Sequence, residues 1–160
     1  MTIKVGDTIP SVTVFTMKEG EVTPVSTDDL FADKRVAFFG VPGAFTPTCS
    51  QQHLPGYVQG ADGLKAKKLD SIICMAVNDV FVMDAWGREH EVGDDFLMVA
   101  DGDAALTKAA GLELDLNGKG LGLRCQRFSM IVENGVVKSI NIDPAGTFDK
   151  SSCEILLSQA

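Results

Sequence analysis

Two short apolar runs constrain the fold of this chain more than any other feature of its sequence. Residues 36–40 (Val-Ala-Phe-Phe-Gly) and residues 71–77 are almost uninterrupted in apolar character. Such runs are typical of strands that are buried on both faces of a sheet. Stretches with helical composition or helical periodicity, 61–68 and 79–90, lie beside them in the sequence. This strand and helix alternation predicts an α/β fold.

The remaining pattern predicts a mixed sheet. Asn134-Gly135 is the strongest hairpin-turn signal in the chain, and a hairpin adds antiparallel pairing to the sheet. Pro24 indicates an edge strand, whereas Gly118, Gly120 and Gly122 fit no phosphate-binding motif and predict a mobile loop. We expect further strands at 11–17, 22–25, 96–100, 128–132 and 136–142, and further helices at 26–30, 104–110 and 151–158. This order of elements resembles the thioredoxin fold with an N-terminal β-hairpin extension.

Composition excludes several classes of protein. A chain of 160 residues suits a single domain, so we expect one domain over residues 1–160. The net charge of −8 and the absence of a basic cluster argue against binding to nucleic acid. No apolar run approaches the roughly 20 residues that span a membrane, and the N-terminus has no leader-like pattern. We therefore expect a cytoplasmic protein.

The four cysteines do not form a structural framework. Cys49, Cys74, Cys125 and Cys153 lie far apart, and no CxxC pair occurs among them. The spacing therefore predicts neither a zinc ribbon nor a thioredoxin-type dithiol, and it differs from the dense spacing of small secreted scaffolds. Reduced thiols in a reducing compartment are the default interpretation.

Cys49 follows a loop that suits sulfur chemistry. Residues 42–50 read Pro-Gly-Ala-Phe-Thr-Pro-Thr-Cys-Ser, and Thr48 is a candidate N-cap for the helix that follows. A free thiol is mostly protonated near neutral pH, but a helix N-terminus and a nearby guanidinium both favour the reactive thiolate. The Thr46 hydroxyl can donate and accept hydrogen bonds. Pro42 has no N–H, so it can pack beside the sulfur without competing for it.

The stretch from Pro42 to Cys49 resembles the Pro-x-x-x-Thr-x-x-Cys signature of peroxiredoxins, and most closely that of the type II or peroxiredoxin-5-like branch. The resemblance covers nearly the whole chain. It extends to Leu54-Pro55-Gly56, Val77-Asn78-Asp79, Phe81-Val82, Ala85-Trp86-Gly87 and Arg127-Phe128-Ser129-Met130, in the expected order. It implies a catalytic set of Cys49, Thr46, Pro42 and Arg127. Strand alternation would put Arg127, Ser129 and Ile131 on one face.

The resemblance implies a thiol-dependent peroxidase that reduces hydrogen peroxide and alkyl hydroperoxides. Cys49 would attack the peroxide, become a sulfenic acid and be recycled by thioredoxin, glutaredoxin or glutathione. No metal or organic cofactor is required. Similar proteins commonly form dimers near the active-site loop, so Phe45 and Trp86 are candidate interface residues.

Other groups offer alternatives. Cys74 and Cys153 are candidate resolving cysteines, although Cys74 also suits a buried structural thiol and Cys153 lies later than the related pattern would place it. Cys125 would share a strand face with Arg127 if alternation held, and Arg124 is a candidate second cation at the rim. His53 lies four residues after Cys49, which invites a Cys–His hydrolase or a metal pair, but no third ligand or Asn/Asp partner supports either, so a structural or capping role is preferred.

Three other functions are compatible with a cysteine at this position on such a fold. One is a peroxide-sensing relay that passes its oxidation to a partner and does not turn over. A thioredoxin-like disulfide oxidoreductase is a second, although the missing CxxC argues against it. The third is a binding or chaperone module with a vestigial site.

Overall fold

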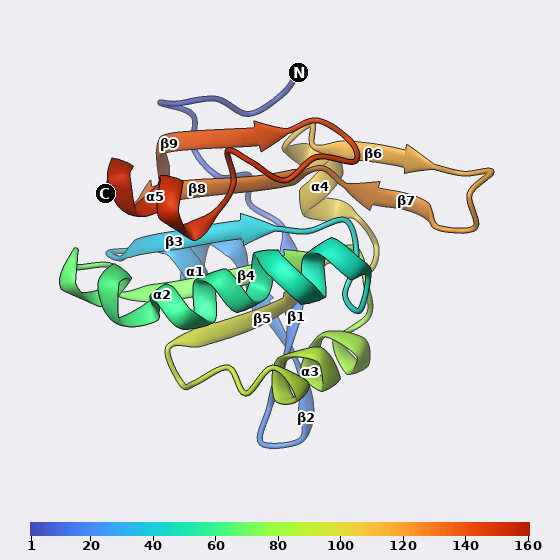
Figure 1. Ribbon diagram of the computed structural model, residues 1–160, viewed down its shortest axis with the longest axis horizontal. Coiled ribbons are helices and arrows are strands. Elements are labelled where there is room, and N and C mark those ends of the chain that lie inside the picture. The colour runs from blue at the N-terminus through green and yellow to red at the C-terminus, as the bar shows by residue number, and fades with distance from the viewer.

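The computed structural model describes residues 1–160 and shows a seven-stranded sheet with helices on both faces (Figure 1). In chain order the elements are β1 (Thr13–Lys18), β2 (Glu21–Ser26), α1 (Thr27–Phe31), β3 (Arg35–Gly40), the π-helix η1 (Cys49–His53), α2 (Leu54–Ala66), β4 (Ser71–Ala76), α3 (Val80–Glu89), β5 (Phe96–Ala100), α4 (Ala105–Ala109), β6 (Glu113–Leu116), β7 (Gly122–Cys125), β8 (Arg127–Glu133), β9 (Val136–Asp143) and α5 (Cys153–Gln159).

The sheet is mixed, as the sequence predicts. Its strand order is β2-β1-β5-β4-β3-β8-β9, with β3, β4 and β5 parallel and the other pairs antiparallel. The predicted N-terminal hairpin is present, since β1 pairs with β2 at one edge and Pro24 lies on the outermost strand. Asn134 and Gly135 both adopt the positive φ that a tight hairpin turn requires, which explains the turn between β8 and β9.

The two faces of the central strands bury two separate apolar clusters. On β3, Ala37 and Phe39 enter a cluster with α2, α3 and α5, whereas Val36 and Phe38 enter a cluster with α1 and α4. A strand covered on both faces has no solvent-facing side, so it shows no polar alternation. This burial explains the apolar run of residues 36–40.

One element departs from the sequence prediction. The glycine-rich stretch predicted to be a mobile loop is the turn of a second antiparallel hairpin, β6–β7, in which Leu116 pairs with Gly122. In Figure 1 this hairpin extends away from the body of the molecule. Gly118 and Gly120 lie in the turn and Gly122 begins β7; all three have positive φ, and glycines leave little hydrophobic pattern for a strand prediction.

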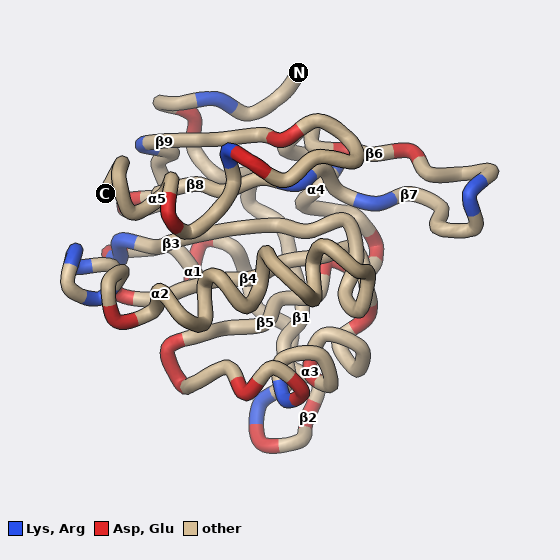
Figure 2. Tube along the Cα trace, in the orientation of Figure 1, with Lys and Arg blue, Asp and Glu red and all other residues tan.

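The charged residues lie mainly on turns and outer segments, where Lys and Arg are interspersed with Asp and Glu (Figure 2). This distribution agrees with the expectation that the chain has no basic stripe for nucleic acid. None of the helices combines the length and the apolar composition needed to cross a membrane.

Candidate active site

Cys49 lies in the first turn of the long helical segment that crosses the front of the sheet. The helix starts earlier than the predicted N-cap at Thr48. Pro47 and Thr48 are already helical, the Ser50 N–H donates to the Thr46 carbonyl at 2.9 Å, and the Thr48 side chain makes no capping bond. Proline favours the first helical position because its φ is fixed near the helical value, which explains the earlier start.

The hydrogen-bonding pattern of the helical segment changes at Cys49. Residues 49–53 form a π-helical turn in which the Leu54 N–H donates to the Cys49 carbonyl, and an α-helix continues to Ala66. Pro55, predicted to kink or interrupt the helix, lies at the start of this α-helical part and donates no hydrogen bond. The interruption is thus a wider turn that carries Cys49 and His53, and both are buried. Single π-turns often occur at functional sites.

Arg127 brings a guanidinium to the cysteine from a distant strand. It lies at the start of β8, is 8% exposed, and its Nη2 donates to Cys49 Sγ at 3.2 Å. The predicted strand face is confirmed, because Ile131 enters the same cluster as Cys49 while Phe128 packs on the opposite face. The structure therefore brings together two predicted residues that are 78 positions apart.

His53 connects Arg127 to the rest of the site, a contact the sequence does not reveal. Arg127 Nη1 donates to His53 Nδ1 at 2.9 Å, and His53 Nε2 lies 3.0 Å from the Ser151 carbonyl. A carbonyl can only accept, so the proton is assigned to Nε2. Burial, assisted by the positive charge of Arg127, lowers the pKa of His53 to about 3. The imidazole is therefore neutral, and it orients the arginine.

Thr46 and Pro42 form the loop beside Cys49 without bonding to its sulfur. The Thr46 hydroxyl donates to the Gly43 carbonyl at 2.7 Å, and the Pro42 carbonyl accepts from Arg124 Nη1 at 3.4 Å. Arg124, the predicted second cation at the rim, thus holds the loop. A Cβ at Gly43 would lie 2.8 Å from Arg124 Nη1, so a larger residue there would displace the end of the arginine side chain.

Two further side chains hold the loop and the helix start. Asn78 Oδ1 accepts from the Ala44 N–H at 2.9 Å, and Trp86 Nε1 donates to Ser50 Oγ at 3.0 Å. Trp86 is fully buried, with its ring centre 6.4 Å from that of Phe45, so it exposes no surface for the predicted interface, whereas Phe45 is 49% exposed. Aromatic residues with a polar group are often buried in this way when the polar group has a partner.

The other three cysteines are buried thiols in different surroundings. Burial raises the pKa of Cys74 well above its usual value, that of Cys125 to about 12 and that of Cys153 to about 11. The expectation that Cys125 shares the face of Arg127 is wrong: Cys125 ends β7 and enters the opposite apolar cluster. Gln126 separates the two strands, so alternation does not carry across it. All four thiols are unpaired.

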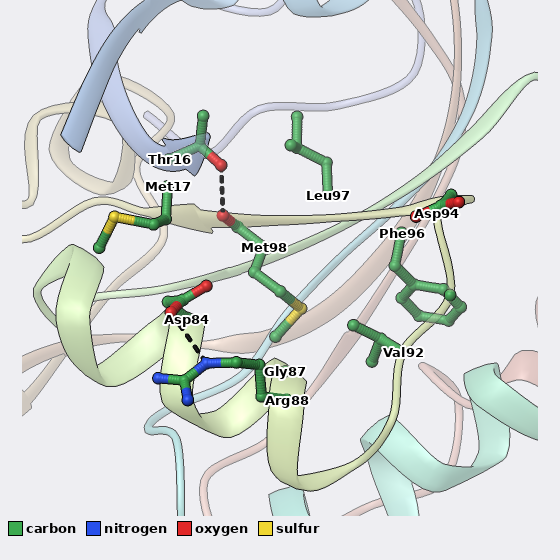
Figure 3. Close-up of a pocket in the computed structure, with 11 residues that line it drawn as sticks. Thr16, Met17, Asp84, Gly87, Arg88, Val92, Asp94, Phe96, Leu97 and Met98 are labelled. Atoms are coloured by element: carbon green, nitrogen blue, oxygen red, sulfur yellow. Dashed lines mark hydrogen bonds and ion pairs between the residues drawn. The ribbon is translucent and has the colours of Figure 1, made fainter. Parts of the chain in front are cut away.

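A cavity of about 280 Å³ lies away from Cys49, between β1, β5 and α3 (Figure 3). Its side chains include Thr16, which donates to the Met98 carbonyl, and an Asp84–Arg88 ion pair. None of the predicted site residues and no cysteine or histidine lines it. No group of three or more metal-binding side chains occurs in the molecule.

Comparisons with known proteins show the family to which the chain belongs. The family model described as Redoxin matches residues 4–157. The chain belongs to the peroxiredoxin family of the thioredoxin-like superfamily. It is 46% identical to peroxiredoxin-2D of Arabidopsis thaliana over 97% of this chain and 96% of that protein.

Solved structures give the same assignment. Reduced Prx3 of Vibrio vulnificus in complex with H2O2 has a TM-score of 0.94 and 47% identity, over 98% of both chains. Peroxiredoxin 5 of Alvinella pompejana has a TM-score of 0.86 and 32% identity, over 98% of this chain and 97% of that one. The protein is a thiol-dependent peroxidase that acts on a peroxide with a thiol reductant. A sensing relay without turnover is not favoured by these relatives.

Proposed function

We propose that Cys49 is the peroxidatic residue and that Arg127 is its cationic partner. The observation that carries this proposal is the 3.2 Å contact between Arg127 Nη2 and Cys49 Sγ inside a buried site. A guanidinium favours the thiolate and can also bind a peroxide oxygen. The other three thiols are held in protonated form by burial, so Cys49 is the thiol best suited to attack.

The reaction that follows from this geometry is a two-electron transfer. The thiolate sulfur attacks the terminal oxygen of the peroxide, an S–O bond forms, and the O–O bond breaks. The leaving hydroxide or alkoxide takes a proton and departs as water or alcohol, while Cys49 becomes a sulfenic acid. Hydrogen peroxide and alkyl hydroperoxides are the proposed substrates, in line with the H2O2 bound to the V. vulnificus relative.

Thr46 and Pro42 have supporting roles in this proposal. The Thr46 hydroxyl donates to the Gly43 carbonyl and retains lone pairs that can accept a hydrogen bond from the incoming peroxide. Pro42 lacks an N–H and therefore does not compete for the thiolate. Thr46→Val should slow oxidation of Cys49, because it removes the hydroxyl while nearly preserving the shape of the side chain.

Peroxide consumption by Cys49→Ser in the presence of excess reductant tests the proposal. The variant should lose turnover, and Cys153→Ser, a substitution of another buried thiol, should retain it. Continued turnover by Cys49→Ser would contradict the assignment. With excess reductant, repeated turnover of the wild-type protein also separates a peroxidase from a relay, since a relay stops after one oxidation without its partner.

An external thiol is the proposed resolving group. Cys153 Sγ packs against Gly60, which lies 11 residues after Cys49, or about 16 Å along the helix axis at 1.5 Å per residue. A disulfide needs Cα atoms within about 7 Å of each other. Cys74 lies in the middle of β4, between β3 and β5, where burial raises the pKa of its thiol well above the usual value and so keeps it protonated. A thiol from thioredoxin, glutaredoxin or glutathione would condense with the sulfenic acid, release water and form the disulfide that a second thiol reduces.

The proposed assembly is a homodimer formed near the active-site loop. Phe45 is 49% exposed and has a positive φ of 65°, and Phe81 on α3 is 65% exposed. Large exposed aromatic side chains are typical of interfaces. Phe45→Asp should convert a dimer to a monomer in sedimentation experiments. A cytoplasmic location is also proposed, although two of the relatives are chloroplastic.

A further inference from the structure

The segment between β9 and α5 is folded around one carboxylate. Asp143 is 2% exposed at the end of β9 and accepts four hydrogen bonds from the chain that follows. The donors are the backbone N–H groups of Asp149, Lys150 and Ser151, at 2.8–3.0 Å, and the Ser151 hydroxyl, at 2.6 Å. Burial acts to raise the pKa of Asp143, but these bonds outweigh it and lower the pKa below its usual value. The carboxylate is thus an anion that organises residues 144–152.

This loop contacts the catalytic groups at two points. The Ser151 carbonyl accepts from His53 Nε2 at 3.0 Å and from the Tyr57 hydroxyl at 2.9 Å. The first bond leaves the His53 Nδ1 lone pair facing Arg127. The Phe148 ring lies 5.7 Å from the Arg127 guanidinium carbon and 5.1 Å from the His53 ring. The loop therefore supports Arg127 directly, through the Phe148 ring, and indirectly, through the bond from His53 to the Ser151 carbonyl.

The sheet register places Asp143 where its carboxylate could form an ion pair with Arg127 and so compete with Cys49 for the guanidinium. The two residues are directly opposite each other on β8 and β9. Opposite charges at such cross-strand positions usually attract each other. Here no ion pair joins them: Arg127 donates to Cys49 and His53, while the loop donors occupy Asp143. The loop therefore keeps the carboxylate away from the guanidinium.

We propose that Asp143 is a positioning residue for the peroxidase reaction: it folds residues 144–152 so that Ser151 and Phe148 hold His53 and Arg127 in place for Cys49. This inference rests on the proposed roles of Cys49 and Arg127. Asp143 forms no hydrogen bond with Cys49 and no ion pair with Arg127, so it acts through the loop that its carboxylate organises. Loss of the Asp143 carboxylate would leave the steps of the reaction unchanged. It would lower the fraction of molecules in which Arg127 donates its hydrogen bond to Cys49 Sγ.

The first test measures the rate of Cys49 oxidation by H2O2 in Asp143→Asn. Asn retains one acceptor oxygen but not the charge, so we expect a slowing of about 10-fold, as for the loss of a charge-assisted hydrogen bond. Asp149→Asn is the matched control, because Asp149 lies exposed in the same loop and accepts no bond through its side chain. Ser151→Ala, which removes one of the four bonds, should give a smaller slowing in a folded protein.

The second test separates positioning from stability. In an Arg127→Ala background, Asp143→Asn should cause no further slowing, and in the wild-type background it should move the pH midpoint of Cys49 alkylation by iodoacetamide upward. Equal slowing in both backgrounds would overturn the inference, as would a wild-type rate of oxidation in Asp143→Asn. If Arg127→Ala itself reacts at the wild-type rate, the proposed function fails. If Arg127→Ala is slow while Asp143→Asn is fast, only the role of Asp143 fails.

Discussion

The buried histidine makes a quantitative prediction about acid stability. Burial lowers the pKa of His53 from 6.5 to about 3, so between these values the unfolded chain binds a proton that the folded chain does not. A depressed folded pKa means that the stabilising contribution is complete above the unfolded pKa and declines as the pH falls through this window. At 1.36 kcal/mol per pH unit, His53 should cost the protein about 2 kcal/mol of unfolding free energy between pH 7 and pH 5.

The assay is urea unfolding of wild type, His53→Gln and His90→Gln at several pH values in this range. His53→Gln should lower the unfolding free energy at pH 7, but the variant has lost the titrating group. Between pH 7 and pH 5, the drop in its unfolding free energy should therefore be smaller than the wild-type drop by about 2 kcal/mol. His90, the other histidine, is only half-buried, and His90→Gln serves as the matched control for replacing a histidine by glutamine. Parallel curves for wild type and His53→Gln would refute the argument that His53 is buried as a neutral group.

Three other perturbations test the packing of the helical segment that carries Cys49. Gly60→Ala should lower the unfolding free energy by about 1–3 kcal/mol, because a Cβ there would lie 2.5 Å from Cys153 Sγ, and Cys153→Ala should restore part of the loss. Gly63→Ala should instead raise the unfolding free energy by up to about 1 kcal/mol, because a Cβ there would lie 3.5 Å from its nearest neighbour, Leu157 Cδ2. Urea unfolding measures both effects. Trp86→Phe removes the donor to Ser50 and should cost about 1–2 kcal/mol in the same assay.

The sequence predicts the central architecture because burial on two faces leaves a strong local pattern. The apolar run at 36–40 indicates β3, and Asn134-Gly135 indicates the turn between β8 and β9. The face on which Arg127 lies follows from alternation within one strand. Each of these predictions depends only on residues that are close in sequence, where propensity and periodicity act.

Predictions that cross element boundaries were less successful. Cys125 was placed on the face of Arg127 by counting alternation through Gln126, whose N–H bonds to the Leu112 carbonyl outside both strands. The β6–β7 hairpin was not predicted, because its glycine turn resembles an unstructured loop. The contact of Arg127 with His53 spans 74 positions and leaves no local pattern. Asp143 was missed for another reason: three of its four partners are backbone N–H groups of the following loop, and these leave no mark in the residue types.

The central claim is that Cys49 alone reacts with peroxide, activated by Arg127 at 3.2 Å. The most direct test is intact-mass analysis after stoichiometric H2O2, on Cys49→Ser and on a variant in which Cys74, Cys125 and Cys153 are all replaced by Ala. The variant that keeps only Cys49 should gain one oxygen and react with a sulfenic-acid probe, while Cys49→Ser should stay unmodified. Rapid oxidation of Cys49→Ser, or an unreactive variant that is folded and keeps only Cys49, would contradict the claim.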